Sequence, residues 1–81
     1  MITIYTKDYC PYCVKAKSLL SSIWATYEEV DITHDSDAFM KIYEKSHMRT
    51  VPQIFVGDLC LGGYDDIQNL HDAGKLAQYI A

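Results

Sequence analysis

The chain has 81 residues, enough for one domain with a single hydrophobic core and too few for a second. Hydrophobic residues make up 49% of it and aromatic residues 12%, a composition that indicates a folded domain and excludes a disordered segment. The formal net charge is −4 and the lysines are scattered singly, so nucleic-acid binding through phosphate neutralisation is not expected.

The first half of the chain predicts a strand, a helix and a second strand. The alternating, β-branched segment MITIYT indicates a strand at residues 2–6. From Pro11 onward, apolar residues recur every three or four positions, which predicts an amphipathic helix to about Trp24. The segment YEEVDI indicates a second strand at residues 27–32. Because strand–helix–strand crossovers are right-handed and join parallel strands, we expect these two strands to pair in parallel.

The second half predicts a helix, a hairpin and a last helix. Asp35 and Ser36 are N-cap candidates for a helix that runs to about His47. QIFV at 53–56 and LCL at 59–61 indicate two strands joined by a tight Gly-Asp turn. The last helix is expected to begin at about Asp65. The order β-α-β-α-β-β-α predicts the α/β class, with a mixed four-stranded sheet covered by helices on both faces.

The motif CPYC at residues 10–13 falls between the first strand and the first helix. Cys10 is expected at the N-cap and Pro11 at the first helical position, where its missing N–H costs nothing. The free N–H groups of the first turn would then point at the Cys10 sulfur and favour its thiolate. Cys13 lies one turn further along and is set back toward the core. One thiol is therefore expected to be presented and the other held in reserve.

Nothing in the sequence points to a membrane or to export. The apolar runs are too short to span a bilayer, and the first residues, MITIYTKD, lack the charged and apolar regions of a secretory signal. We therefore expect a single domain over residues 1–81 in the cytoplasm, with no membrane partner. Stable structural disulfides are rare in that compartment.

Two other uses of the cysteine pair are less favoured. A disulfide between Cys10 and Cys13 would close a very short ring and constrain the unfolded chain little, so it would be a poor structural link. A zinc site would need two more ligands, and His34, His47 and His71 fall in three different segments without the usual spacing. We therefore expect a redox pair and no metal.

Two later motifs each allow a binding role and an ordinary one. Before Pro52, Val51 must be extended, and a cis bond would leave its N–H and C=O free to pair with an extended peptide. In GGYDD at 62–66, the start of the last helix could bind a carboxylate and Asp66 could hold an ammonium group. A loop proline and a glycine turn with an aspartate cap would explain the same residues. Neither motif alone distinguishes the binding role from the ordinary structural one.

Together, CPYC at 10–13, TVPQIF at 50–55 and GGYDD at 62–66 resemble the glutaredoxins, specifically the small dithiol class. The resemblance covers the whole chain and is specific because all three motifs occur in the same order and spacing. It implies a thioredoxin fold with glutathione as the co-substrate. By this resemblance, Cys10 is the nucleophile and Cys13 the resolving thiol.

The resemblance also implies where glutathione would bind. Lys7 and Arg49 would face its glycine carboxylate, and the backbone of Val51, before a cis Pro52, would pair with its cysteinyl residue. The γ-glutamyl end would lie on the first turn of the last helix, with the Asp66 side chain. The glutathione-binding residues implied in this way are Lys7, Tyr12, Arg49, Thr50, Val51, Pro52, Gly63, Tyr64, Asp65 and Asp66.

The implied activity is glutathione-dependent reduction of protein disulfides and of glutathione mixed disulfides. A one-cysteine route would use Cys10 alone, and a two-cysteine route would end in a Cys10–Cys13 disulfide. The implied partners are glutathione and disulfide-containing or glutathionylated proteins, with ribonucleotide reductase as a candidate. The protein is expected to act as a monomer.

Two rival functions remain open. The protein could be a glutaredoxin-like redoxin that thioredoxin reductase reduces directly, although Arg49, Tyr64 and Asp66 favour glutathione. It could instead bind a [2Fe–2S] cluster between two protomers with glutathione as co-ligand, which would make Cys10 a ligand. Pro11 disfavours that function, because cluster-binding relatives tend to carry a smaller or polar residue there.

Several other residues carry further expectations. His47 stands where relatives often carry glycine, so it is expected to end its helix in the left-handed conformation. Cys60, on the last strand, is expected to be a small core residue, with a regulatory or dimer-forming thiol as the alternative. Trp24 and the tyrosines other than Tyr12 are expected mostly in the core and at its rim.

Overall fold

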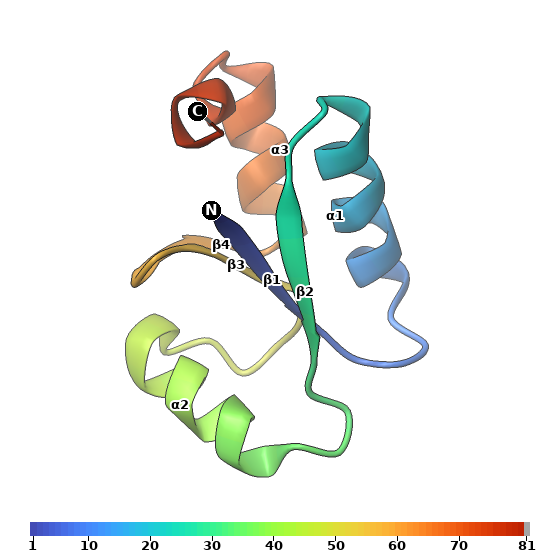
Figure 1. Cartoon of the computed structure of the whole chain (residues 1–81), viewed down its shortest axis with the longest axis vertical. Helices are drawn as coiled ribbons and strands as arrows, with labels where there is room; N and C mark the ends of the chain where they lie inside the picture. Colours follow the sequence, from blue (N-terminus) through green and yellow to red (C-terminus); the bar gives the residue numbers. More distant parts are fainter. Residues whose placement is uncertain (81) are drawn as a thin grey trace.

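A computed structural model describes residues 1–80 of the chain. Its strands and helices follow the predicted order and end in one turn of 3-10 helix at Leu76–Tyr79 (Figure 1). The elements are β1 (Ile2–Thr6), α1 (Pro11–Ser22), β2 (Tyr27–Asp31), α2 (Ser36–Ser46), β3 (Gln53–Val56), β4 (Leu59–Gly62) and α3 (Tyr64–Asp72).

The four strands form one mixed sheet in the order β2-β1-β3-β4. The strands β1 and β2 pair in parallel, whereas β1 with β3 and β3 with β4 pair antiparallel. Helices α1 and α3 lie on one side of this sheet and α2 lies on the other (Figure 1). The predicted α/β class and mixed sheet are therefore confirmed.

The sheet separates two groups of buried side chains. The larger group lies under α1 and α3, and the smaller one, Ile32, Ile42 and Phe55, lies under α2. Alternation along β3 places Ile54 in the first group and Phe55 in the second, because neighbouring strand residues face opposite sides. The buried residues of the larger group are Ile2, Ile4, Ala16, Leu20, Ala25, Ile54, Ile67 and Leu76.

The end of α1 differs from the prediction. The helix stops at Ser22, and Trp24 adopts the left-handed conformation with φ 61° and is 91% exposed. The N–H of Trp24 donates to the Ser21 carbonyl and the N–H of Ala25 donates to the Leu20 carbonyl, which together form a Schellman motif. Trp24 occupies the position where glycine is usual. The prediction that Trp24 belongs to the helix and to the core is wrong.

The other boundaries shift by a residue. The strand β2 ends at Asp31, because the buried Ile32 already turns into the loop before α2. At the far end of α2, His47 is left-handed with φ 59°, as expected, and its N–H donates to the Tyr43 carbonyl. Cys60 is half-buried and packs beside Phe55, which agrees with a mainly structural thiol.

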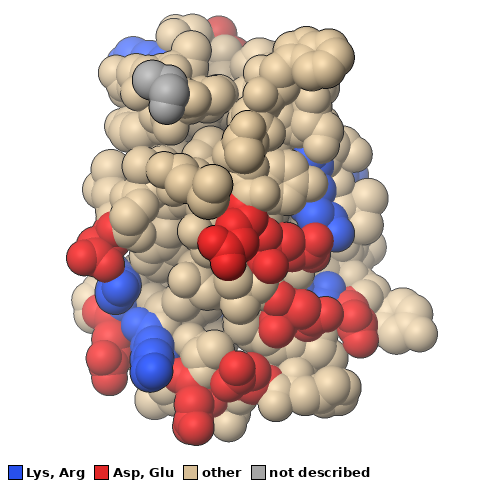
Figure 2. Space-filling model, in the orientation of Figure 1, with Lys and Arg blue, Asp and Glu red and all other residues tan. Residues whose placement is uncertain are grey.

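The strands at the two edges of the sheet are β2 and β4. Along β2, Glu28, Glu29 and Asp31 are exposed. Acidic side chains also gather in the middle of the face of Figure 2, over the region where β2 runs in the matching view of Figure 1. The edge of the sheet beside α1 is therefore acidic.

Candidate active site

Cys10 caps α1, as the sequence predicted. Its backbone is extended, with φ −110° and ψ 101°, and Pro11 is the first helical residue. The Cys10 sulfur accepts a hydrogen bond from the Cys13 N–H at 3.1 Å. The N-terminal end of a helix favours negative charge, and the Cys10 sulfur lies at this end of α1.

Cys13 is the protected member of the pair. It is 2% exposed, whereas Cys10 is half-buried, and both thiols are free. Burial raises the pKa of the Cys13 thiol to about 12, and its hydrogen bond with Cys10 acts in the same direction. Cys13 therefore remains a thiol near neutral pH, held one helical turn from the more accessible sulfur of Cys10.

The loop before β3 reaches the first thiol through Val51. The Val51–Pro52 bond is cis, and the Val51 carbonyl oxygen lies 3.8 Å from the Cys10 sulfur. Gln53, the first residue of β3, supports this loop. Its side chain is fully buried, and its Nε2 donates to the carbonyls of Met48 and Thr50 at 3.0 Å each. The sequence analysis did not single out Gln53, although a polar residue in an otherwise apolar strand was a signal for it.

The start of α3 is built around two glycines and one carboxylate. Gly62 has φ +111°, and a Cβ at this position would overlap the Asp66 carboxylate. The Asp66 carboxylate accepts the Gly63 N–H at 2.8 Å. Helix α3 begins at Tyr64, one residue earlier than expected, so Asp65 and Asp66 both lie in its first turn. Asp66 is thus fixed in position by its own helix.

A groove of about 420 Å³ runs between these two loops. It gathers every residue of the implied glutathione set except Lys7 and Arg49. It also includes Met48, which the sequence analysis missed and whose side chain lies close to Gly63. Its lining residues are Tyr12, Met48, Thr50, Val51, Pro52, Gly63, Tyr64, Asp65 and Asp66.

The two cations expected beside the groove lie along α2 instead. The Lys7 ammonium is 5.4 Å from the centre of the Phe39 ring, and the Arg49 guanidinium is 5.5 Å from that of Tyr43. These two aromatic rings stack on each other with their centres 6.3 Å apart. Lys7 and Arg49 therefore share one aromatic surface of α2 and do not line the groove.

A different lysine packs on the aromatic wall of the groove. The Lys15 ammonium lies 5.1 Å from the centre of the Tyr12 ring and 5.9 Å from that of Tyr64. The two tyrosine rings are 6.2 Å apart. Lys15 thus holds a positive charge against both aromatic side chains that line the groove.

A second cavity, of about 490 Å³, opens on the β2 side of the cysteine pair. Both thiols line it, together with Thr6, Lys17 and Glu29. One carboxylate oxygen of Glu29 accepts the Thr6 hydroxyl at 2.8 Å and the Lys17 ammonium at 3.1 Å. The sequence analysis did not identify this cluster, because its members come from β1, α1 and β2.

Residues 1–80 contain neither a metal-binding cluster nor a membrane-spanning helix. In this part of the chain, no three histidine, cysteine, aspartate or glutamate side chains are grouped closely enough to hold a metal ion. None of the helices described has both the length and the apolar character needed to cross a bilayer. The cysteine pair and its two flanking cavities are therefore the candidate active site.

Comparison with known proteins shows relatives over almost the whole chain. The glutaredoxin family model matches residues 2–61. Glutaredoxin 1 of Rickettsia typhi is 42% identical, over 98% of this chain and 78% of its own length. A glutaredoxin of Pseudomonas aeruginosa is 37% identical, over 93% of this chain and 89% of its own length.

Solved structures agree with the sequence relatives. The solution structure of glutaredoxin from Brucella melitensis superposes with a TM-score of 0.85 at 39% identity and covers 98% of this chain and 86% of that one. A crystal structure of a buckwheat glutaredoxin–glutathione complex superposes with a TM-score of 0.88 at 29% identity, covering 98% and 74%. With its CPYC pair at the start of α1 and its thioredoxin fold, the chain belongs to the glutaredoxin family of thiol–disulfide oxidoreductases.

Proposed function

We propose that this glutaredoxin depends on glutathione, reduces both protein disulfides and glutathione mixed disulfides, and binds glutathione in the groove beside Tyr12. The observation that carries the proposal is that this groove runs from Val51, whose carbonyl oxygen is 3.8 Å from the Cys10 sulfur, to the first turn of α3. A relative solved in complex with glutathione has the same fold. The groove is therefore assigned to the glutathionyl half of the substrate.

The chemistry of the groove suits an extended peptide with a charged group at each end. Within residues 1–80, the N–H and C=O of Val51 make no backbone hydrogen bond, and the C=O accepts only the Cys10 thiol, so both could pair with a cysteinyl backbone once Cys10 is a thiolate. The N–H groups of Asp65 and Asp66 at the start of α3 would receive the γ-glutamyl carboxylate. The Asp66 carboxylate would face the neighbouring ammonium group.

In the one-cysteine route, the Cys10 thiolate attacks the glutathione sulfur of a mixed disulfide. A bond forms between Cys10 and the glutathionyl sulfur, the bond to the target protein breaks, and the protein leaves as a thiolate that takes a proton from water. A second glutathione thiolate then attacks the glutathionyl sulfur. Oxidised glutathione is released and Cys10 is free again.

In the two-cysteine route, Cys10 attacks a disulfide of a target protein and one target cysteine leaves as a thiolate. Cys13 then loses its proton and attacks the Cys10 sulfur. This step forms the Cys10–Cys13 disulfide and releases the second target cysteine as a thiol. Two glutathione molecules reduce the new disulfide and are oxidised in turn.

The deciding experiment follows NADPH consumption with a small glutathione mixed disulfide in two parallel assays. One contains glutathione and glutathione reductase, and the other contains thioredoxin reductase alone. We expect turnover only in the first. Turnover only in the second would assign the protein to the redoxins that thioredoxin reductase serves, and a brown anaerobic preparation would instead indicate a [2Fe–2S] cluster.

The groove itself is tested by Asp66→Asn, which keeps an oxygen for the Gly63 N–H but removes the negative charge. We expect KM for the mixed disulfide to rise about tenfold, because a hydrogen bond to a charged group contributes about 1.5–3 kcal/mol. Asp37→Asn is the matched control, since Asp37 lies in the first turn of α2 and outside the groove. Equal KM values in the two variants would refute this assignment.

The cellular setting is proposed on the same basis. A cytoplasmic monomer that acts on glutathionylated or disulfide-containing proteins fits the chemistry, with ribonucleotide reductase as one candidate target. Neither a metal nor a nucleic acid is needed for either route. Trapping with Cys13→Ser, which would leave targets bound to Cys10, is the direct way to identify the target proteins.

A further inference from the structure

The second cavity contains a fixed positive charge that neither route has used so far. Cys13 and Lys17 are four residues apart on α1, so their side chains lie on the same face of the helix. Both line the cavity of about 490 Å³ beside β2. The buried thiol and the lysine therefore share one space.

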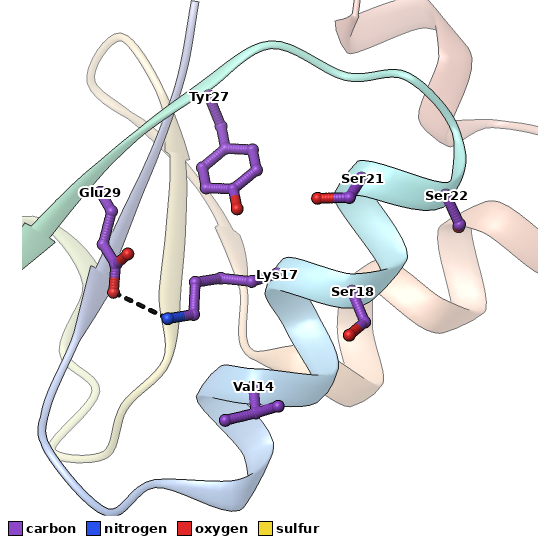
Figure 3. Close-up of a pocket in the computed structure, with 7 residues that line it drawn as sticks. All are labelled: Val14, Lys17, Ser18, Ser21, Ser22, Tyr27 and Glu29. Carbon is purple, nitrogen blue, oxygen red and sulfur yellow. Dashed lines mark hydrogen bonds and ion pairs between the residues drawn. The ribbon is translucent and has the colours of Figure 1, made fainter.

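Lys17 is held in this place by Glu29 on β2, which is itself held by Thr6 on β1. Its ammonium donates to the Glu29 carboxylate at 3.1 Å, and the same oxygen accepts the hydroxyl of Thr6, which is 2% exposed. In Figure 3 the Lys17 side chain reaches across from α1 toward Glu29 on β2. The ion pair thus fixes the ammonium at the wall of the cavity.

The other charged residues of the cavity are mostly acidic, so the positive charge of Lys17 matters for a thiolate at Cys13. Asp8, Glu29 and Asp31 line the same cavity, so its wall carries three carboxylates, and nearby negative charge disfavours a thiolate. Lys7 also lines it, but its ammonium lies against the Phe39 ring. Lys17 is consequently the cation best placed to offset the acidic wall.

A second groove gives water access to the ion pair. It has a volume of about 570 Å³ and shares Val14, Lys17 and Glu29 with the cavity beside the thiols (Figure 3). Its other lining residues are polar: Ser18, Ser21, Ser22 and Tyr27. A proton that leaves the buried thiol can therefore pass to water on this side of the molecule.

We propose that Lys17, oriented by Glu29, stabilises the Cys13 thiolate when Cys13 resolves the mixed disulfide on Cys10. In this step the Cys13 proton passes to water, a bond forms between the two cysteine sulfurs, and the bond from Cys10 to the substrate sulfur breaks. Burial has the largest effect and raises the pKa of Cys13, whereas a backbone hydrogen bond from Lys7 and the charge of Lys17 both lower it. The inference rests on the proposed roles of the two thiols.

The test uses a symmetrical aromatic disulfide whose thiolate is coloured, in a Cys60→Ala background that removes the third thiol. Attack by Cys10 releases the first aromatic thiolate and leaves the second bound to Cys10. Attack by Cys13 then forms the Cys10–Cys13 disulfide and releases the second aromatic thiolate and a proton. At one fixed concentration of the disulfide, the ratio of the second rate to the first compares attack by Cys13 with attack by Cys10 in each variant.

In Lys17→Gln we expect this ratio to fall about threefold. Without the Lys17 charge the Cys13 thiolate would be rarer, and the greater nucleophilicity of a more basic thiolate would offset part of that loss. Lys17→Arg should restore the ratio because it returns the charge. Lys41→Gln on α2 is the matched control, since it removes the same charge away from the cavity.

Glu29→Gln separates the charge of Lys17 from the packing of the ion pair. It keeps an acceptor for Thr6 and Lys17 but leaves the lysine charge uncompensated, so the ratio should rise. A fall in both Lys17→Gln and Glu29→Gln, or no change in Lys17→Gln, would overturn the inference. Absence of either release in the unaltered background would instead contradict the proposed roles of the thiols, and the inference with them.

Discussion

The two sides of the CPYC segment differ in what they offer a substrate. On the α3 side, the groove presents backbone groups, two tyrosines and two aspartates, and no basic side chain is among the lining residues described in 1–80. On the β2 side, the cavity contains both thiols and five charged side chains. In the proposed function, the start of α1 would serve recognition on one side and thiol reactivity on the other. We therefore expect that substitutions can alter glutathione binding and the resolving attack by Cys13 separately.

Cys13→Ser should show the largest difference between the resolving step on the β2 side and glutathione binding on the α3 side. We expect reduction of protein disulfides to fall on the order of a hundredfold, because the intramolecular attack that resolves the intermediate is lost. Turnover of glutathione mixed disulfides should persist, since the one-cysteine route uses Cys10. Steady-state assays with both substrates measure this, and equal loss of both activities would refute the one-cysteine route.

Gly62→Ala should damage the α3 side. The residue has φ +111°, and an added Cβ would overlap the Asp66 carboxylate, so we expect a loss of about 2–4 kcal/mol in the free energy of unfolding from strain and a weakened cap. Urea denaturation measures it. Gly74→Ala is the matched control, because it has φ +71° but open space around it. Equal losses would mean that strain alone matters at Gly62.

The pH dependence of stability should report the burial of Cys13. Its pKa is about 12 in the folded chain against an ordinary 9.0, so between these values the unfolded chain binds fewer protons. Stability should therefore fall as pH rises through this window, and the fall should be smaller in Cys13→Ala. Denaturation midpoints at pH 8 to 11 for both proteins would test it, and identical profiles would contradict it.

Trp24→Gly should affect neither side. Trp24 lies at the far end of α1 in a left-handed conformation that glycine adopts freely, so we expect a gain of about 0.5–1 kcal/mol in the free energy of unfolding. Thermal unfolding measures the gain, and the two thiol-release rates should be unchanged. A loss of stability would show that the exposed indole makes contacts that the backbone term does not outweigh.

The order of elements and the thiol pair could be predicted because their signals are local. Strand alternation, Pro11 after Cys10 and the aspartates after Gly63 each act within a few residues. The prediction for Trp24 was wrong because it also used a local signal. Apolar periodicity continues past Ser22, but the helix ends there with backbone hydrogen bonds that periodicity does not encode.

Contacts between distant segments could not be predicted. Gln53 supports the loop of Met48 through backbone carbonyls, and Glu29 joins Lys17 to Thr6 across three elements. No spacing rule brings such residues together, because their proximity follows from the register of β1 on β2 and the packing of α1. For the same reason Lys7 and Arg49, placed by family resemblance, lie on α2 aromatic rings.

The acidic strand at the edge of the sheet also bears on how copies of the protein meet. An uncovered edge strand is a template on which another chain can add a strand, and like charges along it repel that approach. The Thr33 hydroxyl and N–H lower the pKa of Asp31, so this position keeps its charge further into the acid range than an ordinary aspartate. The acidic residues of β2, including the Glu29 that holds Lys17, thereby also oppose edge-to-edge strand pairing between copies of the protein.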